Sequence, residues 1–145
     1  MAKMIDNKPS WKGEGKVWES LSANLPGDNV VYNQREVNGR EYDFCVMAEN
    51  LGLVIIEVKG WDPDKIDVRG VDNIIVDGYD EPQTSPKKQA RAYRFAILNK
   101  IVEKYNASPL VLDMVCYPFI TQEQYVRTKL DIVSEPEYTI FKEDI

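Results

Sequence analysis

The pattern of apolar and polar positions predicts three consecutive strands in the first half of the chain, at residues 29–37, 41–47 and 53–59. The last of them begins with five apolar residues in succession, which is typical of a strand that is buried on both faces. Turn-forming residues separate the strands at Asn38-Gly39 and at positions 49–52. The sequence therefore predicts an antiparallel meander of three strands.

Two stretches repeat apolar residues with the period of a helix. The first begins at Trp11 and ends at Pro26, and the second begins with Ser85 as N-cap and Pro86 in the first turn and runs to about Tyr105. The buried side of the first helix is expected to contain Glu14, Val17, Trp18, Leu21 and Leu25. The acid Glu14 thus shares an otherwise apolar face.

The remaining segments complete one α/β domain over residues 11–145, preceded by a flexible stretch at residues 1–10. Residues 65–69 and 73–76 are predicted to form a peripheral hairpin, and residues 110–119 a central strand. A short helix or turn at 121–127 and an extended segment at 138–141 follow.

Composition narrows the class of protein. The chain has 145 residues, of which 43% are hydrophobic and 29% charged, and it contains no apolar run near the length of about 20 residues that spans a membrane. It begins without an apolar signal segment, so we expect a cytoplasmic protein with no membrane partner. Cys45 and Cys116 both lie in predicted strands, where we expect reduced, buried thiols.

The absence of histidine excludes Ser-His-Asp hydrolases, histidine-based nucleases and most zinc sites. The net charge of −6 argues against a protein that coats nucleic acid, whose affinity would come from neutralised phosphates. It does not argue against a metal-dependent site, which is acidic until it is loaded.

Three charged residues interrupt the predicted core strands. Because side chains alternate along a strand, Glu57 and Lys59 are expected on the same face, and the hairpin brings Asp43 of the preceding strand close to Glu57. Two carboxylates suit a magnesium ion, and a lysine can orient the attacking water or offset phosphate charge. An ion pair at the end of a strand is the alternative interpretation.

Asp43, followed after thirteen residues by Glu57-Val58-Lys59, resembles the PD-(D/E)XK nuclease superfamily, and residues 13–93 resemble its NERD (nuclease-related domain) family. The resemblance implies a three-layer, restriction-endonuclease-like α/β fold with a central mixed sheet flanked by helices. It also implies Mg²⁺ or Mn²⁺ as cofactor, bound by Asp43, Glu57 and the main-chain carbonyl of Val58. Lys59 would act on the attacking water.

The same resemblance assigns roles to residues of both helices. Glu14 would support the metal site, although capping of the first helix is an alternative. Gln89 and Tyr93 lie four residues apart on one helix face and resemble the Gln-X-X-X-Tyr pair of RecB-like nucleases. Gln89 would hydrogen-bond a water at the metal or a substrate phosphate, and Tyr93 would support it or stack on a base.

Further residues are candidates for contact with nucleic acid. Trp61 can stack on a base or cover the edge of the sheet. A group of cations in the first half of the second helix is a candidate phosphate-binding face, with solvation as the alternative. These cations are Lys87, Lys88, Arg91 and Arg94.

The resemblance thus implies a metal-dependent nuclease domain with DNA as the expected substrate and RNA as the alternative. The family is often found at the start of longer chains, so we expect an N-terminal domain that is fused to or associated with a helicase. Two alternatives stay open: a catalytically inactive version that binds nucleic acid, and an interaction domain in which Glu57 and Lys59 form a strand-end ion pair. The sequence does not indicate an oligomeric state.

Overall fold

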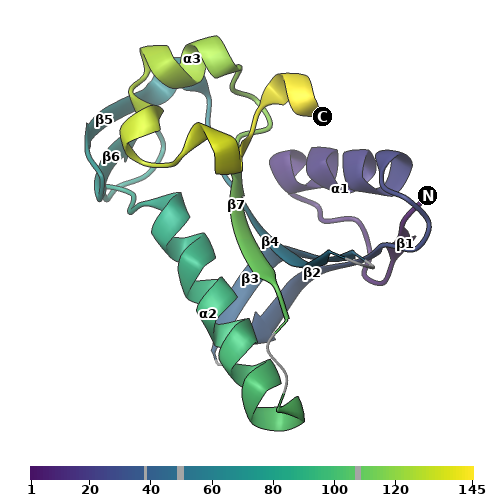
Figure 1. The fold of residues 1–145 in the computed structure, drawn as a ribbon. Coiled ribbons are helices and arrows are strands. Elements are labelled where there is room, and N and C mark those ends of the chain that lie inside the picture. Colours follow the sequence, from purple (N-terminus) through teal and green to yellow (C-terminus); the bar gives the residue numbers. More distant parts are fainter. Residues whose placement is uncertain (38, 49–50, 107–108) are drawn as a thin grey trace.

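A computed structural model describes residues 1–37, 39–48, 51–106 and 109–145 (Figure 1). Its centre is a sheet of six strands, in spatial order β1 (Lys3–Met4), β2 (Val30–Val37), β3 (Arg40–Ala48), β4 (Gly52–Val58), β7 (Val111–Cys116) and β8 (Thr139–Ile140). The meander β2-β3-β4 is antiparallel, whereas β1 pairs parallel to β2, and β7 pairs parallel to both β4 and β8. The predicted mixed sheet is confirmed.

The helices α1 (Lys12–Asn24) and α2 (Pro86–Tyr105) cover opposite faces of this sheet (Figure 1). On the α1 face, Val17 packs in a cluster with alternate residues of the central strands, including Phe44, Val46, Ile56 and Val58. On the α2 face, Ile97 packs with Cys45, Leu53, Ile55 and Val111. The alternation predicted for β4 and the three-layer arrangement are therefore both confirmed.

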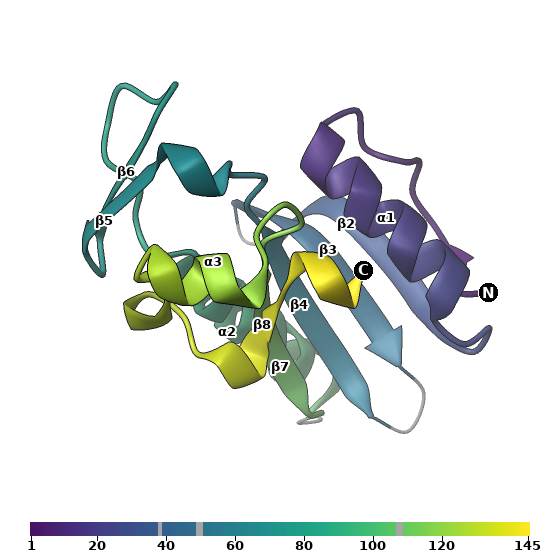
Figure 2. The same ribbon diagram turned by 90° about the horizontal axis from the view of Figure 1, so that it is seen from above.

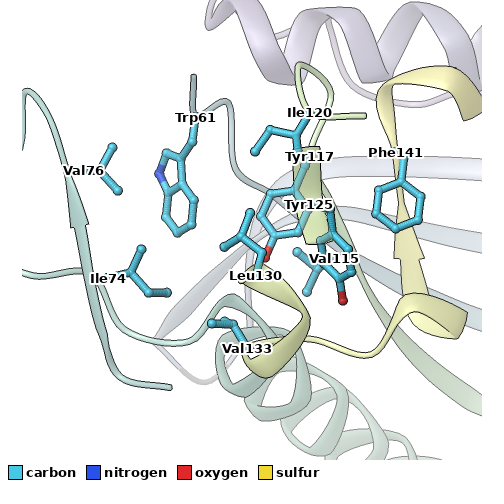
Figure 3. Packing of buried hydrophobic residues seen from close by; sticks show 10 residues of the cluster. All are labelled: Trp61, Ile74, Val76, Val115, Tyr117, Ile120, Tyr125, Leu130, Val133 and Phe141. Atoms are coloured by element: carbon cyan, nitrogen blue, oxygen red, sulfur yellow. The ribbon is translucent and has the colours of Figure 1, made fainter. Parts of the chain in front are cut away.

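A third apolar cluster lies beyond the ends of β4 and β7 (Figure 3). It joins the hairpin of β5 (Ile66–Gly70) and β6 (Asn73–Val76) to α3 (Gln122–Arg127). Tyr117 lies at its centre, with its ring centroid 6.1 Å from those of both Trp61 and Tyr125. Of the short 3-10 turns at Pro63–Lys65, Leu130–Ile132, Pro136–Tyr138 and Lys142–Asp144, the second contributes Leu130 to this cluster.

Local sequence signals explain the ends of α2. Ser85 Oγ accepts a hydrogen bond from the main-chain N–H of Lys88 at 3.3 Å, and Pro86 occupies the first helical position, as predicted. Asn106 ends the helix in a left-handed conformation with φ 51°. Within the described residues, no helix is long and apolar enough to cross a membrane.

Gly52 is required where β4 begins. Its φ is +128°, and a Cβ atom there would collide with the carbonyl oxygen of Leu110. This close approach lets Leu53 donate its main-chain N–H to Leu110 O at 2.9 Å. The predicted turns at Asn38-Gly39 and at residues 49–52 involve positions 38, 49 and 50, which lie outside the described residues.

Two segments differ from the sequence expectation. The strand expected over residues 110–119 ends at Cys116, because the chain turns beyond it and Ile120 donates its N–H to Tyr117 O at 3.2 Å. The stretch at residues 1–10, expected to be flexible, contains β1 paired with β2 and a buried Ala2. Asp6 also accepts hydrogen bonds from main-chain and side-chain donors of β2, which anchors this stretch to the sheet edge.

Candidate active site

A cleft of about 470 Å³ opens where β4 ends. It is lined by residues that the sequence analysis selected from three separate segments: Glu14 from α1, Asp43 from β3, and Glu57, Val58 and Lys59 from β4 and the position after it. The predicted convergence of these side chains is therefore present in the structure.

Two glycines allow α1 to approach this end of β4. A Cβ atom on Gly13 would lie 3.1 Å from the Cα of Gly60, which is closer than ordinary van der Waals contact. Gly13 stands directly before Glu14, and Gly60 directly after Lys59. The close backbone approach thus places the acid of the helix beside the charged end of the strand.

Asp43 lies where β3 and β4 part. Their main-chain pairing ends at Phe44 and Ile56, and one step further the Asp43 Oδ2 atom accepts the N–H of Val58 at 2.7 Å. A side-chain oxygen here replaces a main-chain carbonyl as acceptor, and it fixes the carboxylate beside the end of β4. The side-chain alternation of β3 also changes at this point, because Tyr42 and Cys45 pack on the α2 face while Phe44 packs on the α1 face.

Glu57 and Lys59 contact each other across the end of β4. Lys59 Nζ lies 3.2 Å from Glu57 Oε1, which agrees with the prediction that both side chains share a face. Glu57 is only 6% exposed, and among the described residues its Oε2 atom has no hydrogen-bond partner. A buried carboxylate oxygen without a donor is costly, and either a proton shared with the side chain of Asp43 or a bound cation would remove that cost.

The three acids of the cleft have raised pKa values. Burial, followed by the charge of Asp43, raises the pKa of Glu57 from 4.5 to about 8. Burial also raises the pKa of Asp43, against the opposing effects of the Val58 N–H and Lys59. The pKa of Glu14 is raised by burial and then by Asp43. Burial and the mutual repulsion of these carboxylates, which Lys59 only partly offsets, thus disfavour the ionisation of all three acids in the metal-free cleft.

The family model of the nuclease-related domain, NERD, matches residues 9–118. This chain belongs to the NERD family. A search of the curated proteins finds no significant match to the NERD chain. Among solved structures, a repair endonuclease from Pyrococcus abyssi matches with 15% sequence identity and a TM-score of 0.46, over 93% of this chain and 48% of that one. This chain thus spans about half the length of that endonuclease chain.

The donor set of this NERD domain fits a hard divalent cation. The described residues contain no cluster of three or more acidic, histidine or cysteine side chains that would hold a metal by themselves. Magnesium is commonly held by only one or two carboxylates and keeps several waters. Asp43 and Glu57 are adjacent, and Glu57 has an unpartnered buried oxygen. The two carboxylates, with the carbonyl of Val58, therefore suit this mode of binding.

Gln89 and Tyr93 do not line the cleft. Tyr93 is half-buried, and its pKa is raised by burial and then by the charges of Glu57 and Asp43, which places its hydroxyl in their electrostatic range. Gln89 donates from Nε2 to Thr84 Oγ1 at 3.3 Å, and its buried Oε1 accepts no hydrogen bond from the described residues. Both residues thus lie behind the cleft on α2.

The expectation that four cations of α2 form a phosphate-binding face is wrong for Lys87 and Arg94. Lys87 Nζ lies 2.7 Å from Asp113 Oδ2, and Arg94 Nη1 lies 2.8 Å from Asp113 Oδ1. Asp113 is 2% exposed, in β7. Because the buried aspartate needs both cations as partners, neither is free for phosphate, and the three side chains join α2 to the sheet.

The other two cations of this group lie on the surface of α2. Lys88 forms an exposed ion pair with Asp72. Arg91 is exposed and makes no ion pair with the described residues. The predicted basic face is therefore reduced to Arg91 and a neighbouring pair.

Trp61 is a core residue. It is 3% exposed, and its ring packs between β6 and Tyr117 (Figure 3). Trp61 also lines the cleft, where Lys59 Nζ lies over its ring at 6.0 Å from the centroid. This burial argues against stacking of Trp61 on a base and favours the alternative of a covering role, which Trp61 has at the end of β4.

The sequence analysis missed the aromatic and basic residues at the mouth of the cleft. These are Trp11, Lys12, Tyr79 and Phe119. They come from the start of α1, from the loop after β6 and from the loop after β7, so no periodic pattern connects them. Exposure in the structure marks them as candidates, because Trp11 is 71% exposed and Tyr79 is 55% exposed.

Proposed function

We propose that this NERD domain is a metal-dependent nuclease that hydrolyses phosphodiester bonds, with DNA rather than RNA as substrate and Mg²⁺ or Mn²⁺ as cofactor. The observation that carries the proposal is the buried Glu57, which lies beside Asp43 with one oxygen unpartnered among the described residues. Membership in the nuclease-related domain family supports it.

In this proposal, Asp43, Glu57 and the carbonyl of Val58 hold the cation. A cation held there would supply Lewis-acid chemistry, which would offset phosphate charge and lower the pKa of a water molecule. The main-chain N–H of Val58 donates to Asp43 Oδ2, which orients this carboxylate for the role. Glu14 supports the site from α1, where burial and then the charge of Asp43 raise its pKa.

Lys59 is the cationic side chain that lies beside the carboxylates of the cleft. In the metal-free chain its Nζ lies 3.2 Å from Glu57 Oε1, and it also lines the cleft. Once Glu57 has another cationic partner, the ammonium group is free to orient the attacking water or to stabilise charge that develops on the phosphate. Gln89, whose buried Oε1 has no partner among the described residues, would hydrogen-bond a water at the metal or a substrate phosphate, and Tyr93 would support it or stack on a base.

One observation favours a second candidate, a domain in which Glu57 and Lys59 are only an ion pair. Their 3.2 Å contact is what that interpretation requires. An inactive version of the fold that binds nucleic acid without cutting it is a further outcome. Fusion to a helicase and a cytoplasmic location remain predictions from the sequence.

The proposal is tested by metal titration and cleavage assays on one preparation. Calorimetry with Ca²⁺, Mg²⁺ and Mn²⁺ measures binding, and labelled linear, circular and single-stranded DNA, with RNA in parallel, measures cleavage. A nuclease site binds all three ions and cuts with Mg²⁺ or Mn²⁺. Binding of none of the ions would favour the ion pair, and binding without cleavage would favour the inactive version.

A further inference from the structure

A second hollow of about 410 Å³ continues from the mouth of the cleft along α1. It shares Trp11, Lys12 and Phe119 with the cleft. Because the two hollows have these residues in common, the second lies directly beside the cleft that contains the carboxylates. We call the second hollow the lysine groove.

The lysine groove is basic in a chain whose net charge is −6. Its lining contains Lys8, Lys12 and Lys16 against a single acid, Glu19, which pairs with Lys8. Lys12 and Lys16 lie one helical turn apart on α1, so their ammonium groups face the same side. This concentration of positive charge next to an acidic cleft is suited to a chain of phosphates.

Aromatic rings accompany these lysines. The ammonium groups of Lys12 and Lys16 lie 5.9 and 5.3 Å from the ring centroid of Phe119. Trp11 stands at the junction of the two hollows, and the fold does not use its side chain, which is 71% exposed. Tyr79 lines the cleft from the loop after β6, which lies across from the start of α1 in Figure 2.

Exposed rings beside phosphate-binding lysines are the arrangement that proteins use to hold unpaired nucleotides. A base can stack on a ring only when its own face is free, and in a duplex the neighbouring bases cover that face. The carboxylates also lie deep, since Glu57 is 6% exposed, so the substrate backbone must bend into the cleft to reach them. A single strand meets both requirements.

We infer that the lysine groove binds single-stranded DNA next to the cleavage site: a base stacks on Trp11, and Lys12 and Lys16 hold the neighbouring phosphates. This inference rests on the proposed function, because it takes the carboxylate cleft as the place of cleavage. It assigns the domain a preference for unpaired strands or frayed ends over continuous duplex.

The test measures binding in a chain that does not cut. Fluorescence anisotropy with the Glu57→Gln protein compares a labelled single strand with a hairpin duplex of the same sequence. The single strand should bind more tightly, and adding Trp11→Ala should weaken its binding by about 10-fold or more, the scale of one lost base stack. Tyr105→Ala is the matched control, because Tyr105 is a 67% exposed aromatic residue at the C-terminal end of α2 and does not line the lysine groove.

Salt dependence tests the lysines. Lys12→Gln with Lys16→Gln should reduce the slope of log affinity against log salt by about 1.4, or 0.7 for each phosphate contact on a single strand. The control pair Lys100→Gln with Lys104→Gln lies at the far end of α2 and should leave the slope unchanged. Circular dichroism spectra verify that every variant is folded.

The outcomes separate this inference from the proposed function. Equal affinity for duplex and single strand, an unchanged affinity after Trp11→Ala, or no DNA binding at all would overturn the lysine groove, even if the wild-type chain cuts DNA. Tight binding of the single strand that depends on Trp11, with no cleavage by the wild-type chain in Mn²⁺, would support the groove and contradict the nuclease.

Discussion

The carboxylate of Asp43 accepts the main-chain N–H of Val58 at 2.7 Å, where the pairing of β3 and β4 ends. This bond crosses the opening between the strands and orients Asp43 next to Glu57. One hydrogen bond therefore couples the end of the sheet ladder to the geometry of the candidate metal site. The carboxylate is held in place before any cation arrives.

Removal of the Glu57 carboxylate should change how stability depends on pH. Burial and Asp43 raise the pKa of Glu57 from 4.5 to about 8, so the folded metal-free chain keeps a proton that the unfolded chain releases. The free energy of unfolding therefore falls as the pH rises from about 4.5 to about 8. In Glu57→Gln this contribution is absent, so the melting temperature in EDTA should fall less between about pH 5 and pH 8.

The same substitution at Glu103 serves as the control, because Glu103 is exposed near the far end of α2. Glu103→Gln should leave the pH profile of the wild-type chain unchanged. If Glu57→Gln and the wild-type chain show parallel melting profiles, the carboxyl of Glu57 does not titrate as the structure indicates.

Lys59→Met should separate chemistry from metal binding. The substitution keeps the aliphatic stem and deletes the charge that lies 3.2 Å from Glu57 Oε1. Affinity for Mn²⁺ should hold or rise because a competing cation is gone, while cleavage should fall by roughly 100-fold or more. Calorimetry and a cleavage assay on one preparation measure both, with the exposed Lys65→Met as control. Loss of metal binding together with cleavage would make Lys59 an organiser of the carboxylates.

Asp113 should matter for stability and not for chemistry. Asp113→Ala leaves Lys87 and Arg94 without their buried partner, so the free energy of unfolding should fall by about 3 kcal/mol or more. Asp72→Ala removes the exposed pair with Lys88 and should cost less than about 1 kcal/mol. Urea unfolding of both variants measures the difference, and similar losses would show that the Asp113 cluster is not a structural support.

The elements and the centre of the site follow from short-range patterns in the sequence. The period of two along β4 places Glu57 and Lys59 on one face, and a tight meander places Asp43 on the neighbouring strand. The helical period places Glu14 on the covered side of α1, where it reaches the cleft. Each of these inferences needs only the geometry of one or two adjacent elements.

The surroundings of the site depend on contacts between distant segments, which no local pattern encodes. Lys87 and Arg94 look like free surface cations in the helix sequence, yet their partner Asp113 lies 26 and 19 residues further along the chain. Trp61 is buried only because the hairpin and the segment around Tyr117 pack over it. Trp11 reaches the cleft from the start of α1, a position that a helical pattern leaves undefined.

Cleavage by Asp43→Asn tests the central claim most directly. The amide oxygen of asparagine can still accept the Val58 N–H, so the fold is retained while one ligand charge is removed. The wild-type chain should cut labelled single-stranded DNA in Mn²⁺ and not in EDTA, and Asp43→Asn should lose this metal-dependent cleavage. Cleavage by Asp43→Asn at the wild-type rate would contradict the account.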